Sequence, residues 1–191
     1  MVTGAAKGLR LNAPGEGTRP LSDRLKQGLF AALEADSDFV GGGFLDLYAG
    51  SGAAGIEALS RGAARAVFVE RDARTSRVIA DNLLRSGLAG GTLVRADVLR
   101  YLARPTGTPG RFEACLVDPP YNQPLIAPTL QLLGAGETEW LAPASVVVAK
   151  HFWRAAAPDE IGRLVLYRTR RHGETMLSFY RLGEEQHRRE G

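Results

Sequence analysis

The sequence predicts an α/β fold with a doubly wound, Rossmann-like sheet, mostly parallel and ending in a C-terminal antiparallel hairpin. Short apolar runs of strand length alternate with segments of helical periodicity over most of the 191 residues. Such alternation is typical of parallel sheets, whose right-handed crossovers place helices on both faces. The last two apolar runs have no helix between them and turn at His172-Gly173, which predicts the hairpin.

Each element follows from the spacing of apolar residues and from the residues that begin or end helices. Leu25, Leu29 and Leu33 recur at helical spacing after Ser22, a suitable N-cap, and predict a first helix at residues 23–35. The remaining elements alternate in chain order. We expect strands at residues 44–48, 66–70, 92–95, 112–117, 145–150, 163–170 and 175–181, and helices at residues 53–61, 73–86, 98–103 and 125–133.

Composition and length indicate one main domain. Hydrophobic residues make up 45% and charged residues 24% of the chain, as in ordinary globular proteins. We expect a small basic N-terminal arm or hairpin at residues 1–20, the main domain at residues 21–182 and a polar tail at residues 183–191.

The sequence indicates neither a membrane segment nor a secretory signal. No run approaches the ~18 consecutive apolar residues of a membrane helix, and the N-terminus is too weakly apolar for a signal peptide. The single cysteine, Cys115, lies in an apolar run and is expected to be a buried thiol, and the three histidines lack metal-ligand spacing. We therefore expect a cytoplasmic monomer without a structural metal.

Basic residues gather near both ends of the chain, although the net charge is only +3. Residues 1–28 hold five cations and two acids, and residues 163–172 hold four arginines and no acid. Two basic regions suit a polyanionic partner, while an ordinary solvated surface is the alternative for each. The candidate nucleic-acid contacts are Lys7, Arg10, Arg19, Arg24, Arg168, Arg170 and Arg171.

Asp118-Pro119-Pro120-Tyr121 follows the apolar run at residues 114–117. Two prolines end a strand abruptly, because proline fixes φ and cannot donate to the ladder. The Asp118 carboxylate and a proline carbonyl can accept the two hydrogens of an amine on a flat ring, and the Tyr121 ring can stack on that ring. A strand-ending turn with a surface tyrosine is the alternative for this motif taken alone.

Gly50, Gly52 and Gly55 form a G-x-G-x-x-G pattern between the first expected strand and the helix after it. Such a loop lets a ligand approach the backbone closely in front of a helix N-terminus. Glu70, which ends the next strand, is placed to accept hydrogen bonds from a ribose diol. NAD-type and S-adenosylmethionine-type sites share this arrangement, so the loop alone fits both.

Two further acids favour S-adenosylmethionine. Asp46 lies four residues before Gly50, where dinucleotide folds usually have an apolar residue, and its carboxylate can bind the cationic amino end of the methionine moiety. Asp97 follows the third strand and suits an adenine amino group. The alternatives are a buried carboxylate that accepts loop amides for Asp46 and a helix N-cap for Asp97. The candidate cofactor-binding residues are Asp46, Tyr48, Gly50, Gly52, Glu70, Arg71, Asp97 and Val98.

The order of these motifs resembles that of amino-methyltransferases that use S-adenosylmethionine and, more narrowly, the bacterial 16S rRNA guanine-N2 methyltransferases of the small-subunit type. Arg-Pro-x-x-Asp-Arg at residues 19–24 is the most family-specific segment, although Leu21-Ser22 keeps one hydroxyl where members commonly have two. The resemblance covers residues 2 to about 182. The supporting segments are residues 4–8, 19–24, 46–52, 56–62, 68–70 and 118–121.

The resemblance implies methyl transfer to the exocyclic N2 of a guanine in ribosomal RNA, either free or in an assembling small subunit. It also implies that Asp118, Pro119, Pro120 and Tyr121 form the catalytic motif. Lys150-His151 ends the fifth expected strand beside this motif and is a candidate for substrate contact.

Four other functions remain open. An adenine-N6 DNA methyltransferase also uses Asp-Pro-Pro-Tyr but needs a target-recognition domain, for which 191 residues leave little room. Protein glutamine methyltransferases usually carry Asn in place of Asp118. A nicotinamide-dependent oxidoreductase fits the glycine loop alone, and a non-catalytic RNA-binding subunit can retain the same fold.

Overall fold

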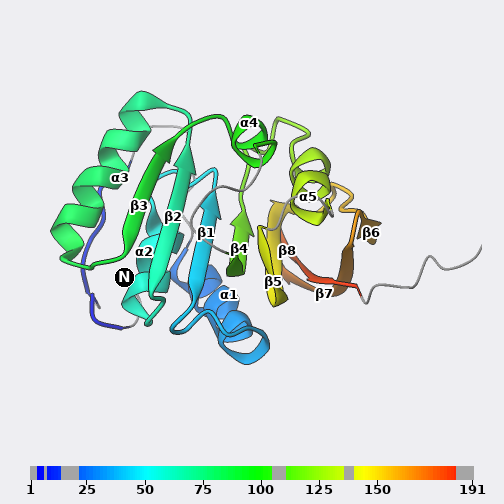
Figure 1. Cartoon of the computed structure of the whole chain (residues 1–191), viewed down its shortest axis with the longest axis horizontal. Coiled ribbons are helices and arrows are strands. Elements are labelled where there is room, and N and C mark those ends of the chain that lie inside the picture. The colour runs from blue at the N-terminus through cyan, green and yellow to red at the C-terminus, as the bar shows by residue number, and fades with distance from the viewer. Residues whose placement is uncertain (1–3, 7, 14–21, 105–110, 136–139, 184–191) are drawn as a thin grey trace, which may run out of the picture.

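An eight-stranded sheet forms the centre of the computed structural model, which describes residues 4–6, 8–13, 22–104, 111–135 and 140–183 (Figure 1). The strand order is β3-β2-β1-β4-β5-β8-β7-β6. The strands are β1 (Gly43–Leu47), β2 (Arg65–Glu70), β3 (Gly91–Arg95), β4 (Phe112–Val117), β5 (Leu141–Phe152), β6 (Glu160–Ile161), β7 (Leu164–His172) and β8 (Thr175–Leu182). The helices are α1 (Asp23–Asp36), α2 (Ala53–Ser60), α3 (Ala73–Ser86), α4 (Val98–Leu102) and α5 (Ile126–Gly134).

The predicted mostly parallel sheet with a C-terminal hairpin is confirmed. β3, β2, β1, β4 and β5 pair in parallel, and β8 pairs antiparallel with both β5 and β7. The chain order reverses at β1, which lies between β2 and β4. In open α/β sheets, ligands bind beyond the carboxyl ends of the strands at such a switch point. A binding site is therefore expected between the loops that follow β1 and β4.

Two apolar cores, one on each face of the sheet, confirm the doubly wound arrangement. Phe44 and Phe68 face α1, α2 and α3, whereas Leu45, Leu47 and Cys115 face α4 and α5. β1 is buried on both faces, as the central strand of such a sheet requires. The Cys115 thiol is fully buried, as expected, and burial raises its pKa well above the usual value.

The largest difference from the predicted elements concerns β5, which begins at Leu141 rather than at residue 145. Leu141 pairs with Phe112, and the pairing then shifts register before Ala114 pairs with Val146. This irregularity interrupts the period-two pattern from which strands are predicted. The sequence pattern also omits β6, because a strand of two residues has no period.

Two kinds of feature do not occur in the part of the chain that the structure describes. No helix there combines the length and the apolar character that a bilayer-spanning segment needs. No group of three or more His, Cys, Asp or Glu side chains among these residues is arranged to hold a metal ion.

The predicted N-terminal arm is described at residues 4–6 and 8–13, which contain neither helix nor strand. The Ala5 amide donates to the Ser60 carbonyl at 2.9 Å. This bond fastens the arm to the C-terminal end of α2. The rest of the arm and nearly all of the predicted polar tail lie outside the described residues.

Asn82 of α3 joins this arm to the loop after β1. Its side chain is fully buried. Asn82 Nδ2 donates to the carbonyl of Asn12 at 3.0 Å and to the carbonyl of Ser51 at 2.9 Å. Asn82 Oδ1 accepts from the Asn12 amide at 2.8 Å. One side chain thus satisfies backbone groups of two segments that are far apart in the sequence.

Replacing Asn82 with alanine should lower the free energy of unfolding by about 1–3 kcal/mol, because backbone groups of Asn12 and Ser51 lose their hydrogen-bond partner. Urea denaturation would measure the change. Asp81→Ala, at an exposed position of the same helix, is the matched control and should change stability by less than about 0.5 kcal/mol. Equal stability of the two variants would contradict this role of Asn82.

Candidate active site

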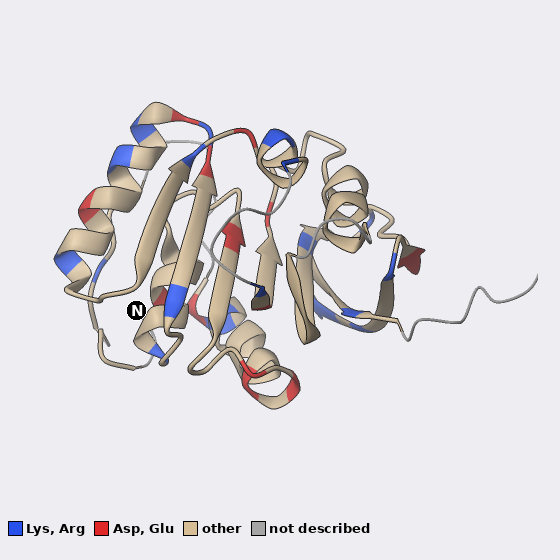
Figure 2. Ribbon diagram, in the orientation of Figure 1, with Lys and Arg blue, Asp and Glu red and all other residues tan. Residues whose placement is uncertain are grey.

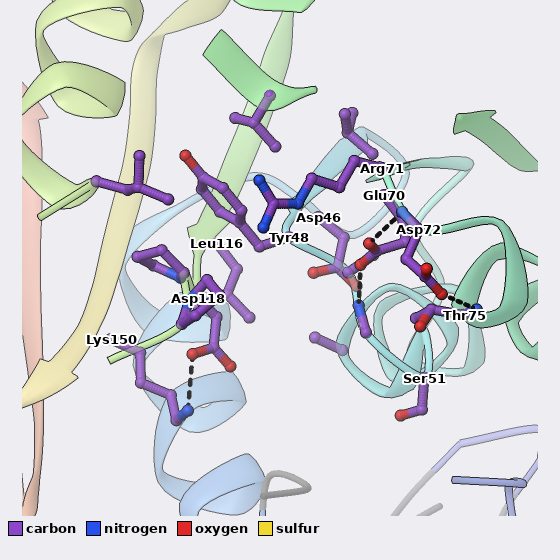
Figure 3. Close-up of a pocket in the computed structure, with 18 of the residues that line it drawn as sticks. Asp46, Tyr48, Ser51, Glu70, Arg71, Asp72, Thr75, Leu116, Asp118 and Lys150 are labelled. Carbon is purple, nitrogen blue, oxygen red and sulfur yellow. Dashed lines mark hydrogen bonds and ion pairs between the residues drawn. The ribbon is translucent and has the colours of Figure 1, made fainter. Parts of the chain in front are cut away.

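A cavity of about 620 Å³ opens at the carboxyl ends of β1, β2 and β4 (Figure 3). Its walls come from the loops after these strands, the start of α4 and one side chain of β5. A volume of this size is usual for a small-molecule site. The predicted site residues that line the cavity are Asp46, Tyr48, Gly50, Glu70, Arg71, Val98, Asp118, Pro119, Pro120 and Tyr121.

The loop after β1 is shaped by residues with a left-handed backbone. Tyr48, Gly50 and Gly52 have φ angles of 62°, 57° and 76°, a region that glycine adopts at little cost. Gly50 lines the cavity, whereas Gly52 is the buried N-cap of α2 and is not part of the lining. A Cβ atom at Gly55 would lie 2.3 Å from Phe68 Cε1, so this third glycine lets α2 pack closely against the sheet.

The Glu70 carboxylate is held by backbone amides on both sides. Its Oε2 accepts from the Gly50 amide at 3.1 Å, and its Oε1 accepts from the Asp72 amide at 2.9 Å. A carboxylate has about four acceptor positions, so Glu70 can still accept hydrogen bonds from hydroxyl groups in the cavity. In Figure 3, Arg71 extends across the cavity toward Tyr48.

Asp46 lies beneath the same loop and is only 2% exposed. Its Oδ2 accepts from the Gly55 amide at 2.9 Å, so Asp46 is a buried carboxylate that binds a loop amide, one of the two roles considered for it from the sequence. Asp46 also lines the cavity, as the other role requires. Burial is the main reason why the pKa of Asp46 rises to about 8, and the charges of Asp118 and Glu70 add to the effect. Together with Asp72, four acids line this cavity, which favours a cationic ligand.

Besides Gly52, two other residues singled out from the sequence, Asp97 and His151, lie outside the cavity. The Asp97 carboxylate accepts from the Arg100 amide at 3.1 Å and caps α4, which is the alternative named above. Its neighbour Val98 does reach the cavity. His151 is buried, and its Nε2 lies 2.8 Å from Ser178 Oγ. Both side chains therefore have local partners in the fold.

The sequence analysis missed several residues of the lining. Asp72 accepts from the Thr75 amide at 2.8 Å and caps α3, and both residues face the cavity. An acid directly before an expected helix is a signal that would have identified Asp72. Asn122 and Gln123 follow the Asp-Pro-Pro-Tyr motif, but no spacing or pattern of their own marks them. Further missed residues are Ser51 and Leu125.

Asp118 forms an ion pair with Lys150, the side chain that β5 contributes to the cavity (Figure 3). Lys150 Nζ lies 2.7 Å from Asp118 Oδ1, and the two side chains are 7% and 21% exposed. The same Nζ lies 4.9 Å from the centroid of the Tyr121 ring, whose hydroxyl is 3.2 Å from Thr175 Oγ1 on β8. Lys150 therefore links the acid and the aromatic ring of the motif.

Burial and ion pairing act in opposite directions on these two groups. Burial raises the pKa of the Asp118 carboxyl, and the attraction of Lys150 offsets this only in part. Burial lowers the pKa of Lys150, but the charge and hydrogen bond of Asp118, together with Tyr121, outweigh it and raise that pKa. Lys150 therefore keeps its positive charge at neutral pH.

Two of the predicted nucleic-acid contacts converge on a second cavity, of about 320 Å³. Arg24 of α1 and Arg171 of β7 line it together with His172. Arg168, in contrast, pairs with Asp36 of α1 at 2.8 Å and holds the hairpin against that helix. Figure 2 shows that Lys and Arg are spread over several elements.

The remaining basic candidates lie at other positions. Arg170 is exposed, and its Nη1 lies 3.5 Å from the Gly28 carbonyl of α1. Arg10 is exposed on the arm. Lys7 and Arg19 fall outside the described residues.

The fold is that of α/β methyltransferases. An RNA methyltransferase from Salinibacter ruber, solved in complex with S-adenosyl-L-homocysteine, shares the fold with a TM-score of 0.65 at 17% identity, over 87% of this chain and 95% of that chain. The chain belongs to the family described as conserved hypothetical protein 95, whose model matches residues 1–181.

Named relatives cover nearly the whole chain. It is 31% identical over 181 residues to ribosomal RNA small subunit methyltransferase D of Escherichia coli (strain K12), with 94% of this chain and 88% of that protein covered. It is 34% identical over 183 residues to YlbH of Bacillus subtilis (strain 168), named as a candidate rRNA methyltransferase, with 95% and 97% covered. The solved structure of yhhF from Escherichia coli, described as a candidate methyltransferase, is similar with a TM-score of 0.80 at 29% identity, over 96% and 97% of the two chains. These relationships confirm the predicted family and class of enzyme.

Asp46→Asn should flatten the pH dependence of stability between about pH 4 and pH 8. The Asp46 pKa is about 8 in the folded chain, and an unfolded aspartate has a pKa of about 3.9. The folded chain therefore holds this proton more tightly than the unfolded chain does. The proton contributes its full amount to the free energy of unfolding below the pKa of the unfolded aspartate. This contribution falls as the pH rises and is lost at about pH 8. The expected slope is up to roughly 1.4 kcal/mol per pH unit.

Urea unfolding of both proteins across this pH range would measure the difference in slope. Asp81→Asn, at an exposed site, should follow the wild-type profile. If the wild-type and Asp46→Asn profiles run parallel, Asp46 is not the protonated group that the structure indicates.

Proposed function

We propose that the chain transfers the methyl group of S-adenosylmethionine to the exocyclic N2 amine of a guanine in 16S ribosomal RNA. The observation that carries this proposal is that Asp118-Pro119-Pro120-Tyr121 and the glycine loop line the same cavity. The relative named ribosomal RNA small subunit methyltransferase D supports the class of substrate.

The side chains that line the cavity suit the different parts of S-adenosylmethionine. Glu70, fixed by two amides, suits the ribose hydroxyls. Asp46 suits the positively charged amino end of the methionine moiety. Val98 offers an apolar contact to the adenine ring, a role for which it is a better candidate than Asp97. When bound, S-adenosylmethionine supplies an electrophilic methyl group.

Asp118 and the Pro119 carbonyl are the proposed acceptors for the two hydrogens of the target amine. Guanine N2 is a weak nucleophile because its lone pair is delocalised into the ring. Hydrogen bonds to both acceptors would hold the amine with its lone pair directed at the methyl carbon. The N–C bond forms while the C–S bond breaks with its electron pair on sulfur, and the surplus proton leaves to Asp118 or to water. Tyr121, which is 44% exposed, is available to stack on the base.

RNA phosphates are the proposed ligands of the second cavity. Arg24 and Arg171 converge there from α1 and β7, and arginine suits phosphate because its guanidinium can donate two parallel hydrogen bonds. We also propose phosphate contacts for the exposed Arg10 and Arg170, while Arg168 acts mainly through Asp36. Lys7 and Arg19 stay predictions from the sequence.

The proposed partner is ribosomal RNA, either free or in an assembling small subunit, which implies a cytoplasmic location. Incubation of the protein with small subunits from cells that lack the gene, followed by mapping of the methylated base, tests the whole proposal. A single N2-methylguanine would support it, whereas N6-methyladenine would favour the adenine-specific alternative. Calorimetry that detects binding of NADH and none of S-adenosylmethionine would overturn it.

Asp118→Ala should lower the rate of methyl transfer by about a hundredfold or more, because the developing charge on N2 loses its carboxylate. The affinity for S-adenosylmethionine, measured by calorimetry, should stay within a few fold, since Asp118 is not among its proposed ligands. Asp118→Asn keeps the size of the side chain and should show a similar loss. If the Asp118→Ala protein remains active, Asp118 is not part of the reactive centre.

Arg24→Ala and Arg171→Ala should each weaken RNA binding and flatten its salt dependence. For a single-stranded contact, each lost arginine–phosphate pair should reduce the slope of log K against log salt by about 0.7. Fluorescence anisotropy over a range of salt concentrations would measure the slope. Arg100→Ala, exposed on α4 on the opposite face of the sheet, is the control and should leave the slope unchanged. Slopes equal to that control would exclude phosphate contacts in the second cavity.

A further inference from the structure

The Asp118–Lys150 ion pair is built into the register of the sheet. Val117 of β4 pairs with Ala149 of β5 in parallel. Asp118 directly follows Val117 at the end of β4, and Lys150 directly follows Ala149 within β5, so the carboxylate and the ammonium lie side by side. Figure 3 shows the two side chains turned toward each other within the cavity.

The pair presents hydrogen-bonding groups in a fixed order. The Asp118 carboxylate offers two acceptor oxygens, and Lys150 Nζ follows as a donor 2.7 Å from Oδ1. An ammonium has three hydrogens and a carboxylate has about four acceptor positions, so the ion pair leaves both groups able to bind a ligand. The resulting order along one edge is acceptor, acceptor, donor.

Guanine presents the complementary order on its Watson–Crick edge. Its N2 amine and N1–H are donors, and its O6 is an acceptor, which is why cytosine pairs with it through two acceptors and one donor. Adenine presents an N6 amine donor beside an unprotonated N1, which would face a carboxylate oxygen with a lone pair. The Asp118–Lys150 pair therefore matches guanine and opposes adenine.

We propose that Asp118 and Lys150 together read the Watson–Crick edge of the target guanine, Asp118 accepting from N2 and N1 and Lys150 donating to O6. This inference rests on the proposed function, and it makes Lys150 a specificity-determining residue of that site. The second hydrogen of N2 remains directed toward the Pro119 carbonyl. Recognition of the edge and positioning of the amine thus use the same contacts.

The burial of the pair supports this role. Lys150 is 7% exposed, and few water molecules can compete with a base for its hydrogens. A site that is built to hydrogen-bond a substrate group discriminates strongly against an analogue that lacks the group, because its own polar atoms are then left unpaired. The alternative is that Lys150 acts only on Asp118, by keeping it ionised and in one orientation.

The base analogue 2-aminopurine separates these two roles. It keeps the N2 amine but has neither the N1 hydrogen nor O6. We would measure single-turnover methylation of one RNA that carries either guanine or 2-aminopurine at the target position. Wild type, Lys150→Met and Lys150→Arg would be compared.

Wild type should prefer guanine strongly. In Lys150→Met, both rates should fall because Asp118 loses its partner, but the rate with guanine should fall by about tenfold more than the rate with 2-aminopurine, because only guanine also loses a contact to O6. The preference for guanine therefore shrinks by the same factor. Lys150→Arg retains charge and donors and should restore most of it. Lys26→Met replaces another buried lysine, which pairs with Asp23, and should keep the wild-type preference.

Equal losses with guanine and 2-aminopurine would overturn the proposal, because Lys150 would then act only through Asp118. An unchanged preference in Lys150→Met would overturn it as well. Calorimetry with S-adenosylmethionine would verify that the variant retains a folded site. A wild-type protein that binds S-adenosylmethionine but methylates neither RNA would instead refute the proposed function on which this inference rests.

Discussion

The parallel alignment of β1, β4 and β5 is the constraint on which the candidate site depends. Val117 pairs with both Leu47 and Ala149, so β1 and β4 end beside each other, while β5 continues past them to Phe152. Asp118 follows Val117, and Lys150 follows Ala149 within β5, so the contact between these two side chains is a direct result of the register. Because the apolar cores on both faces hold these strands in register, the packing that stabilises the fold also sets the geometry of the site.

Four acids line one cavity, and Asp72 among them accepts from the Thr75 amide as the N-cap of α3. The other three are each stabilised in a different way. Glu70 accepts from two backbone amides, Asp118 pairs with Lys150, and Asp46 takes up a proton as its pKa rises to about 8. Uncompensated like charges in a partly buried site would oppose folding. A cationic ligand beside Asp46 would favour the ionised form and so replace the proton. The electrostatics of the cavity and the charge of the proposed cofactor are therefore consistent.

Local signals in the sequence were sufficient to predict the fold and much of the cavity lining. Gly50, Glu70 and Asp118, for example, were identified because each lies at or after the end of an apolar run of strand length. Contacts between distant segments were beyond such signals. The sequence placed Lys150 beside the Asp-Pro-Pro-Tyr motif, but its ion pair with Asp118 depends on the order and register of the strands, which periodicity does not define. The sequence identified Arg168 as a candidate RNA contact from its charge alone. In the structure, Arg168 pairs with Asp36, which lies on a helix over a hundred residues earlier in the chain.

The C-terminal hairpin connects the two proposed substrate surfaces. Thr175 contacts the Tyr121 hydroxyl beside the first cavity, and Arg171 and His172, just before the turn, line the second. Arg168 ties the same hairpin to α1, which contributes Arg24 to the second cavity. A base stacked on Tyr121 and a phosphate held by the arginines would therefore be kept at a fixed separation. Such a constraint favours a nucleotide that already protrudes from its helix or loop, since a stacked base could not reach the first cavity while its neighbouring phosphate occupies the second.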